Sequence, residues 1–276
     1  MTFFDCFICL IIGYLIGGFS TAITLSILVQ HHDIRKTGSG NAGATNMLRS
    51  YGWRAGLFTF FIDVLKGFLA TYIGLRLYSE IGAVLCGTAA VIGHTYPLYY
   101  GFKGGKGISV TIGMMALLSP WLLLITAPLI ITVIAVTRIV SLGSVSGNIL
   151  LVCLNWAFNR EHIWVCIAIS FICLLNIFSH RSNIARLLKG TEAKMNWKEL
   201  SRPQIKLKLD ENKETEQIKK AGDGTCTRNL LIPNQLLCQL SYSSNRLILS
   251  TCYLIVKKKQ KTILFNKFAQ RQNSRG

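Results

Sequence analysis

Three short segments combine glycines with cationic or hydrogen-bonding side chains, and long apolar runs separate them. They are residues 37–49 (TGSGNAGATNMLR), residues 93–107 (GHTYPLYYGFKGGKG) and residues 180–192 (HRSNIARLLKGTE). Glycines let the backbone turn its N–H groups towards an anion, and Lys and Arg supply positive charge. If the fold brings the three segments together, they would form a site for a substrate that carries phosphate.

The run Gly104-Gly105-Lys106-Gly107 differs from a nucleotide-binding P-loop at two positions. Tyr100 stands where the P-loop pattern requires its first glycine, and Gly107 stands where it requires a metal-binding hydroxyl. The run can still bind phosphate, because Lys103 and Lys106 supply charge and a helix start supplies N–H groups. The alternative is an interfacial pair of lysines next to glycine turns.

In the first segment, Arg49 can hold a phosphate through two hydrogen bonds, and the Ser39 hydroxyl can donate another. Gly40, Asn41 and Asn46 lie between them and could add contacts. A polar loop that caps the next helix would explain one or two of these groups. Because it does not explain all of them, a binding site is the preferred interpretation.

In the third segment, His180, Asn183 and Arg186 follow one another at helical spacing and would share one helix face. Positively charged anchors after the last membrane span would account for Arg181 and Arg186. They account less well for His180 and Asn183, which we therefore assign to the same site.

Asp63 and Lys66 stand three residues apart inside an apolar run. An unpaired charge in mid-membrane costs roughly 2.5–3.5 kcal/mol, so we expect the two to pair, either as a structural element or to orient the first segment. His94 is expected to form hydrogen bonds at a helix end. No Ser-His-Asp set, metal-binding cluster or pair of acid/base carboxylates can be assembled from the sequence. We therefore expect neither a metal nor a cofactor, and a reaction driven by positioning and charge stabilisation.

The elements that must position these residues are membrane helices. Of the 276 residues 51% are hydrophobic and 15% are charged, whereas a soluble domain carries about 25% charged residues. A span needs roughly 20 apolar residues. Suitable runs are 4–29, 56–78, 81–99, 108–137, 140–158 and 162–179. The run 108–137 is too long for one crossing and is divided at Pro120, which predicts an all-α polytopic membrane protein with about seven transmembrane helices.

The charge distribution predicts the orientation of these helices. The formal net charge is +18, and basic residues gather in the predicted loops 30–55 and 100–107 and after residue 180, which hold the three segments. The positive-inside rule then places these segments on the cytoplasmic face and the N-terminus outside. A basic surplus can also indicate nucleic acid binding, but the membrane interpretation explains its distribution and no nucleic acid partner is expected.

The chain divides into a predicted membrane domain, residues 1–198, and a basic tail, residues 199–276. Residues 201–276 hold 15 Lys and Arg against 5 Asp and Glu, and the stretch 206–220 is poor in apolar residues. Such a composition is typical of disorder. We expect this tail to be disordered or not native to the domain.

Taken together, the three segments and Asp63-Val-Leu-Lys-Gly67 resemble the signatures of the acyl-phosphate-dependent glycerol-3-phosphate acyltransferase family of bacterial membranes. The resemblance covers roughly residues 5–195, with the motifs in the family's order and spacing. It implies transfer of an acyl group from acyl phosphate to the sn-1 hydroxyl of glycerol 3-phosphate, giving 1-acyl-glycerol 3-phosphate (lysophosphatidic acid) and inorganic phosphate in phospholipid biosynthesis.

The resemblance also implies the roles of individual residues. The catalytic group would be Ser39, Arg49, Lys106, His180 and Asn183, and further phosphate contacts would come from Gly40, Asn41, Asn46, Lys103, Gly104, Gly105 and Gly107. Asp63, Lys66 and His94 would be structural or orient the loops. The partners would be acyl phosphate, glycerol 3-phosphate and membrane lipids, with the protein a monomer in the bacterial plasma (inner) membrane and its site facing the cytoplasm.

Two other functions fit basic loops on a membrane face. An organic-phosphate transporter would need inverted repeats and broken helices at the membrane midplane, and the sequence has no convincing repeat. A scaffold that binds anionic lipids would not need asparagine and serine at these spacings.

Overall fold

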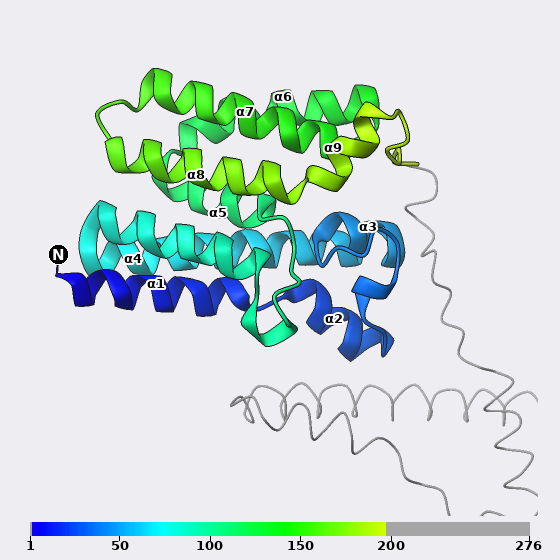
Figure 1. Cartoon of the computed structure of the whole chain (residues 1–276), viewed down its shortest axis with the longest axis horizontal. Helices are drawn as coiled ribbons and strands as arrows, with labels where there is room; N and C mark the ends of the chain where they lie inside the picture. Colours follow the sequence, from blue (N-terminus) through cyan, green and yellow to red (C-terminus); the bar gives the residue numbers. More distant parts are fainter. Residues whose placement is uncertain (1, 197–276) are drawn as a thin grey trace, which may run out of the picture. The chain divides into compact units, whose positions relative to one another are not determined.

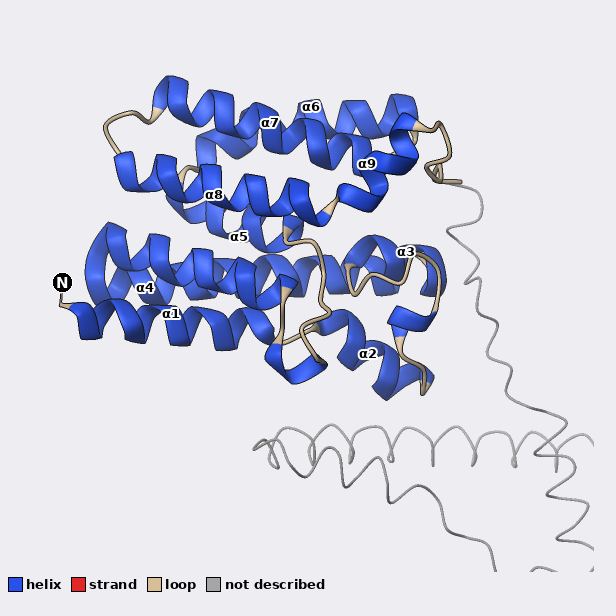
Figure 2. Cartoon of the chain, viewed as in Figure 1, coloured by secondary structure: helices blue, strands red, loops and turns tan. Residues whose placement is uncertain are grey.

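The computed structural model describes residues 2–196, and all regular secondary structure in this part of the chain is helical (Figures 1 and 2). The longer helices are α1 (Phe3–Gly18), α2 (Thr21–Gln30), α3 (Ala44–Tyr51), α4 (Trp53–Thr95), α5 (Ile108–Leu118), α6 (Pro120–Thr137), α7 (Val140–Phe158), α8 (Ile163–Ser179) and α9 (Arg181–Leu188). Two short 3₁₀ turns are η1 (Ile34–Lys36) and η2 (Leu98–Tyr100). The predicted tail, residues 199–276, lies outside the described residues.

The first apolar run, expected as one span over residues 4–29, forms two helices. α1 ends at Gly18, and the Ser20 hydroxyl starts α2 by accepting a hydrogen bond from the Ile23 N–H at 3.4 Å. The Phe19 carbonyl group, freed by this break, accepts a hydrogen bond from the Lys66 ammonium group at 2.7 Å. A serine N-cap and a buried lysine therefore explain a break that the apolar composition conceals.

The predicted spans 56–78 and 81–99 correspond to the two arms of α4. The backbone leaves helical geometry at Tyr78 and at Ser79, whose φ is 57°. The arms pack closely beside this kink, since a methyl group on Gly74 would lie 2.6 Å from the carbonyl carbon of Gly82. The position of the predicted boundary between the two spans is therefore confirmed.

The long apolar region 108–137 divides where proline predicted. α5 ends at Leu118, and Pro120 occupies the first turn of α6, where a missing N–H costs nothing. The helices α7 and α8 agree with the predicted spans 140–158 and 162–179 to within one residue.

Four helical stretches are long and apolar enough to cross a membrane: Phe3–Gln30, Trp53–Tyr100, Pro120–Thr137 and Val140–Phe158. α8 and α9 together would make a fifth, bent by 59°, and α5 is a shorter apolar helix. These helices fit the all-α membrane fold that was predicted. The count of seven crossings and the outside position of the N-terminus stay predictions.

The polar stretch between residues 30 and 54 was expected as a loop, yet it contains α3. Gly43 precedes this helix and Gly52 ends it, and between them Met47 is fully buried. α3 packs on α4 so closely that a methyl group on Gly56 would lie 2.8 Å from the Leu48 Cα atom. Burial of one apolar side and contact with α4 therefore stabilise a helix too short to stand alone.

Glycines let α1, α4 and α5 approach backbone to backbone. A methyl group on Gly17 of α1 would lie 2.5 Å from the Ala90 Cα atom of α4, and one on Gly113 of α5 would lie 2.7 Å from the Phe68 nitrogen of α4. Small residues permit such crossings in membranes. They fix the start of α5, and hence the second segment, relative to α4.

The core that follows from this packing lies mainly between α4, α5 and α8. Its fully buried side chains include Val91, Val110, Met115, Ile169 and Ile172. In the view of Figure 1, α3 and α9 lie at the same end of the bundle, away from the N-terminus. This arrangement brings the first and third segments to one end of the molecule.

Candidate active site

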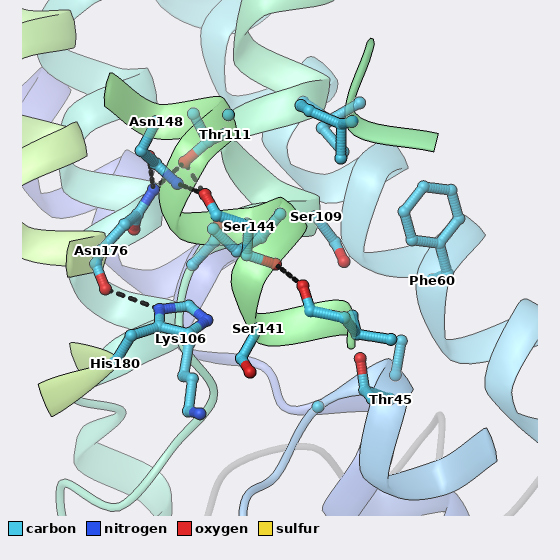
Figure 3. Close-up of a pocket in the computed structure, with 18 of the residues that line it drawn as sticks. Thr45, Phe60, Lys106, Ser109, Thr111, Ser141, Ser144, Asn148, Asn176 and His180 are labelled. Atoms are coloured by element: carbon cyan, nitrogen blue, oxygen red, sulfur yellow. Dashed lines mark hydrogen bonds between the residues drawn. The ribbon is translucent and has the colours of Figure 1, made fainter. Parts of the chain in front are cut away.

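A cavity of about 450 Å³ lies at the convergence of the three predicted segments. The segments contribute Ser39, Asn41 and Arg49, then Lys106 and Gly107, then His180 and Asn183 to its lining. Figure 3 shows Thr45, Lys106 and His180 around this cavity, together with polar side chains of α5 and α7. All five residues that the resemblance marks as catalytic therefore border one space.

Two helices begin at the cavity wall. Gly43 precedes α3 and Gly107 precedes α5, and within residues 2–196 neither helix start receives a hydrogen bond from a capping side chain. Both glycines line the cavity, as do the first residues of the two helices, Ala44 and Ile108. Because the first N–H groups of a helix have no partner inside the helix, both helix starts can offer donors to an anion.

Gly107 sits at a position that requires glycine. Its φ is +86°, a conformation that other residues adopt with strain. A methyl group there would also overlap the side-chain oxygen of Asn176. The turn before α5 and the packing of α8 thus depend on each other at this residue.

Gly104 and Gly105, expected to contact phosphate, form backbone hydrogen bonds within the protein. The N–H of Gly104 donates to the Thr95 carbonyl oxygen at 3.2 Å, and that of Gly105 donates to the His94 carbonyl oxygen at 3.0 Å. These bonds tie the loop to the end of α4, so in this structure the two N–H groups brace the loop. Among the described residues, the cavity lining includes neither of these two glycines, and it includes neither Gly40 nor Lys103.

Asn46, expected to contact substrate, has a structural role in the loop. Its side chain is buried, and its oxygen accepts a hydrogen bond from the Ser39 N–H at 3.0 Å. Its amide group donates to the carbonyl oxygens of Ile34, Thr37 and Asn41 at 2.9–3.2 Å. Asn46 therefore shapes the segment that presents Ser39 and Asn41 to the cavity.

Glu192, to which the sequence interpretation gave no role, organises the cationic end of the cavity. One carboxylate oxygen accepts hydrogen bonds from Ser141 Oγ at 2.7 Å and Asn183 Nδ2 at 2.6 Å, and the other accepts from Arg186 Nε at 2.6 Å. The Asn183 side-chain oxygen then accepts a hydrogen bond from the Lys106 ammonium group. The carboxylate thus orients an amide that orients a lysine.

Burial and neighbouring charges shift the pKa values of the ionisable groups at this end of the cavity. Burial, with the neighbouring Arg186 and Arg49, lowers the pKa of Lys106 to about 8 although Glu192 opposes the shift. Burial also lowers the pKa of Arg49, against the opposing charge of Glu192. Burial raises the pKa of Glu192, but hydrogen bonds from Ser141, Asn183 and Arg186 outweigh it and hold that pKa below its ordinary value. The site is therefore a partly desolvated cluster with more positive than negative groups, and it favours an anion.

His180 is held by its own helix. Its Nδ1 atom lies 2.8 Å from the Asn176 carbonyl oxygen and the residue is buried. Because a carbonyl oxygen only accepts, Nδ1 carries the proton and Nε2 of the neutral ring is left as an acceptor. Figure 3 shows the dashed contact to Asn176 and the ring beside Lys106.

A buried polar network extends from this histidine, and sequence reasoning missed it. Asn176 Nδ2 donates to Thr111 Oγ1 at 3.0 Å and to Asn148 Oδ1 at 3.1 Å, and the Asn148 amide donates to the Ser144 carbonyl oxygen at 2.7 Å. Asn148 lies one helical turn from Ser144, which is itself one turn from Ser141, inside a mostly apolar span. That spacing was the available signal, since polar residues at helical spacing in a membrane span face the bundle interior.

Asp63 and Lys66 form the expected ion pair. Their Oδ1 and Nζ atoms lie 2.9 Å apart, and both side chains are buried. Asp63 also accepts a hydrogen bond from the Thr21 hydroxyl at 3.0 Å, and Lys66 Nζ lies 2.9 Å from His94 Nδ1. The cluster joins α2 to both arms of α4, and its Asp63 and His94 border the cavity.

The remainder of the cavity wall is mostly apolar. α6 contributes a stripe at helical spacing, Leu123, Thr126, Ala127, Ile130, Ile131 and Ile134, and α5 adds Ile112 and Met115. From Ile134 to Leu123 the stripe extends ~16 Å at 1.5 Å per residue. Within residues 2–196 no group of three or more His, Cys, Asp or Glu side chains is placed to hold a metal ion. The geometry thus combines an anion site with an apolar slot.

Comparison with known proteins identifies the family. The family model described as glycerol-3-phosphate acyltransferase matches residues 7–190. The chain belongs to this glycerol-3-phosphate acyltransferase family. The predicted family and its acyltransferase class are therefore confirmed, and the matched region contains every cavity-lining residue named above except Glu192.

Two curated members of the glycerol-3-phosphate acyltransferase family illustrate the match. The protein of Thermoanaerobacter pseudethanolicus is 46% identical over 189 residues, 68% of this chain and 94% of its own length. The protein of Finegoldia magna is 43% identical over 185 residues, 67% of this chain and 93% of its own length. The residues beyond the matched part include the predicted tail.

Two solved structures resemble this acyltransferase fold. Both are crystal structures of PlsY (YgiH), an integral membrane glycerol 3-phosphate acyltransferase, one in the glycerol 3-phosphate form and one in the lysophosphatidic acid form. The first has a TM-score of 0.67 and 32% sequence identity, and it covers 71% of this chain and 98% of that chain. The second has a TM-score of 0.64 and 31% identity, over 71% of this chain and 97% of that one. The all-α membrane fold is confirmed by this likeness.

Proposed function

We propose that this chain transfers an acyl group from acyl phosphate to the sn-1 hydroxyl of glycerol 3-phosphate. The observation that carries the proposal is the composition of the cavity wall, which combines Arg49 and Lys106 with an apolar stripe on α6. The Ile134 end of this stripe rests on Gly143 of α7, two residues from the Ser141 that bonds Glu192 at the cationic end. An acyl phosphate has the same two parts, an anionic head and a hydrocarbon tail. The glycerol 3-phosphate and lysophosphatidic acid forms of the PlsY relative support the acceptor and the product.

The two phosphate groups would share the cationic end. Arg49, Lys106 and the starts of α3 and α5 supply charge and N–H donors, and Ser39, Asn41 and Asn183 supply polar contacts. An anion next to Lys106 offsets the burial that lowers its pKa, so substrate binding and protonation of this lysine reinforce each other. Charge-assisted contacts of this kind are the strong ones.

The reaction would be a direct acyl transfer. The sn-1 hydroxyl oxygen forms a bond to the acyl carbonyl carbon, and the bond from that carbon to the phosphate oxygen breaks with its electrons passing to phosphate. The hydroxyl proton passes to a substrate phosphate oxygen, which yields 1-acyl-glycerol 3-phosphate and inorganic phosphate. The protein then needs no nucleophile of its own, and its contribution is orientation and stabilisation of the departing charge.

His180 would position the acceptor. Its neutral ring is fixed by the Asn176 carbonyl, so Nε2 can accept a hydrogen bond from a glycerol hydroxyl group. Asn183 would be oriented by Glu192 for the same task. These roles make His180 and Asn183 positioning groups next to the two cations.

A product assay tests the function. Purified protein in detergent is mixed with palmitoyl phosphate and labelled glycerol 3-phosphate, and lysophosphatidic acid and inorganic phosphate are measured. Equal amounts of both products, with none from palmitoyl coenzyme A, are expected. Labelled glycerol 3-phosphate that only accumulates inside sealed vesicles, unacylated, would instead establish the transporter.

We also propose that the protein is a monomer in the bacterial plasma membrane with its cavity facing the cytoplasm. The cationic loops beside the cavity support this orientation through the positive-inside rule. The exposed positions Lys36, Lys103 and Lys189 allow a test in a cysteine-free background. Single cysteines there should react with an impermeant thiol reagent in lysed cells and not in intact ones, and reaction of any one in intact cells would overturn the orientation.

A further inference from the structure

The helix α6 forms one whole wall of the apolar slot, yet it is weakly embedded in the protein. Only 11% of its span is buried, against 39% for α7. Ile131, which lines the cavity, is 65% exposed. The position of this wall therefore depends on the few contacts that α6 makes.

The backbone leaves helical geometry at both ends of α6. Ser119 precedes it with non-helical φ and ψ, and Arg138 follows it in the left-handed conformation with φ 61°. Pro128 inside the helix removes one backbone hydrogen bond. Its principal packing partner is α7 and the next is α5. The contact with α7 is therefore what sets the distance between α6 and the opposite wall.

Two glycines of α7 receive α6 at this contact. A methyl group on Gly147 would overlap Ile130 Cδ1 and lie 2.6 Å from Ile130 Cγ1, and one on Gly143 would lie 2.5 Å from Ile134 Cγ1. Ile130 and Ile134 therefore rest directly on glycine backbone. The spacing of four residues between the glycines is the one that lets membrane helices pack closely.

Ile130 and Gly147 also line the cavity themselves. The Ile130 side chain is thus held between the backbone of α7 and the slot. If the glycine gains a methyl group, this side chain has to move, and the neighbouring free space is the slot. Along α6, Ile130 lies ~6 Å from Ile134 and ~10 Å from Leu123, so the constriction would fall partway down the stripe.

We propose that Gly147 and Ile130 set the width of the acyl slot and thereby determine which acyl chains this protein accepts. The inference rests on the proposed function, since it assumes that the stripe on α6 holds the acyl chain. It identifies the substrate class as acyl phosphates whose chains extend beyond Ile130, accepted because glycine at position 147 leaves room for that side chain. Shorter chains would end before the pair and would not sense it.

The test compares butanoyl, octanoyl and palmitoyl phosphate as donors. Gly147→Ala is expected to lower kcat/KM for palmitoyl phosphate by about tenfold or more, the usual effect of one methylene in a hydrophobic pocket. The value for butanoyl phosphate and the KM for glycerol 3-phosphate should stay within about twofold. Ser146→Ala is the matched control on α7, because the Ser146 hydroxyl bonds its own helix backbone at Leu142 and is not in the cavity lining.

Two further variants keep the test decisive if Gly147→Ala folds poorly. Ile130→Val removes the Cδ1 atom and should raise the preference for palmitoyl over butanoyl phosphate. Gly147→Ala with Ile130→Ala, which removes both Cγ1 and Cδ1 and so relieves the overlap, should restore activity on palmitoyl phosphate. An unchanged donor profile in Ile130→Val, or no restoration in the double variant, would overturn the proposal. If the unaltered protein forms no lysophosphatidic acid from any of the three donors, the proposed function fails instead.

Discussion

Replacing Lys106 by methionine should separate activity from stability. The side chains are similar in length, but the ammonium group is buried beside Arg186 and Arg49, and burial lowers its pKa to about 8. A lowered pKa for a base means that its charged form is disfavoured by folding. The destabilisation of the folded state by the charged lysine is fully present below about pH 8, and it disappears as the pH rises to the ordinary pKa of lysine. At neutral pH, methionine therefore removes a cost, and the unfolding midpoint should stay equal or rise.

The activity of the same variant should fall. A hydrogen bond to a charged group contributes about 1.5–3 kcal/mol, which corresponds to a loss of about 10- to 150-fold in kcat/KM when it is made in the transition state. The Asn183 oxygen that loses Lys106 faces the cavity, so water can replace the lysine there. A low activity together with an undiminished midpoint is the expected pattern.

Ligand stabilisation gives an independent measurement. At 100 times its dissociation constant, a ligand stabilises the folded protein by about 2.7 kcal/mol. Glycerol 3-phosphate at one fixed concentration should raise the midpoint of the unaltered protein in detergent more than that of Lys106→Met. Lys36→Met, at an exposed cationic position, is the control for a change of charge alone. A Lys106→Met protein with kcat/KM within threefold of the unaltered protein would refute the role of this lysine, and a lower midpoint would refute the argument from burial.

Three further predictions concern the same end of the cavity. The value of kcat/KM should fall as the pH rises through about 8, because Lys106 then loses its proton, and Lys106→Arg should move the fall to higher pH; identical profiles in the two proteins would contradict this. Glu192→Gln keeps the side-chain volume but removes the charge that holds Arg186 and Asn183. The free energy of unfolding should therefore fall by about 1–3 kcal/mol, and the rate in the product assay should fall at least tenfold. An unchanged melting curve would show that the carboxylate does not brace the site. His180→Ala should lose most of its kcat/KM with an unchanged pH optimum, since the ring acts as a neutral positioning group; a shifted optimum without loss of rate would assign it another task.

The sequence pattern could predict the membership of the site better than the role of each member. Ser39, Arg49 and Lys106 were identifiable because glycine next to a basic or hydroxyl residue favours anion binding. Asn46 fits that pattern equally well, yet it bonds three carbonyl oxygens of its own loop. An amide at the cavity and an amide that braces a loop have the same composition around them, and only the folded structure separates the two: Asn183 lines the cavity and Asn46 does not, although both are buried.

Contacts between distant segments were beyond sequence reasoning. Glu192 meets Ser141 across 51 residues and Asn176 meets Thr111 across 65. The break at Pro120 was predictable because proline acts locally. The break before Ser20 was not, because it is supported by Lys66, which follows much later in the chain. The sequence therefore predicts a helix end that nearby residues determine, but not one that depends on a residue far away in the chain.

The backbone-on-backbone crossings of α1, α4 and α5 bear on how hybrids between related enzymes should be assembled. Gly113 and Gly17 leave no tolerance for a foreign neighbour, so a transplanted α4 would need its own α1 and α5. The glycines of α7, Gly143 and Gly147, face α6 itself, so the glycine contacts of the α6–α7 hairpin lie within it. A hybrid enzyme could therefore acquire a relative's acyl-chain preference by exchange of that hairpin as one unit, provided that Ser141 and Asn148 are kept, because they bond Glu192 and Asn176 at the headgroup end.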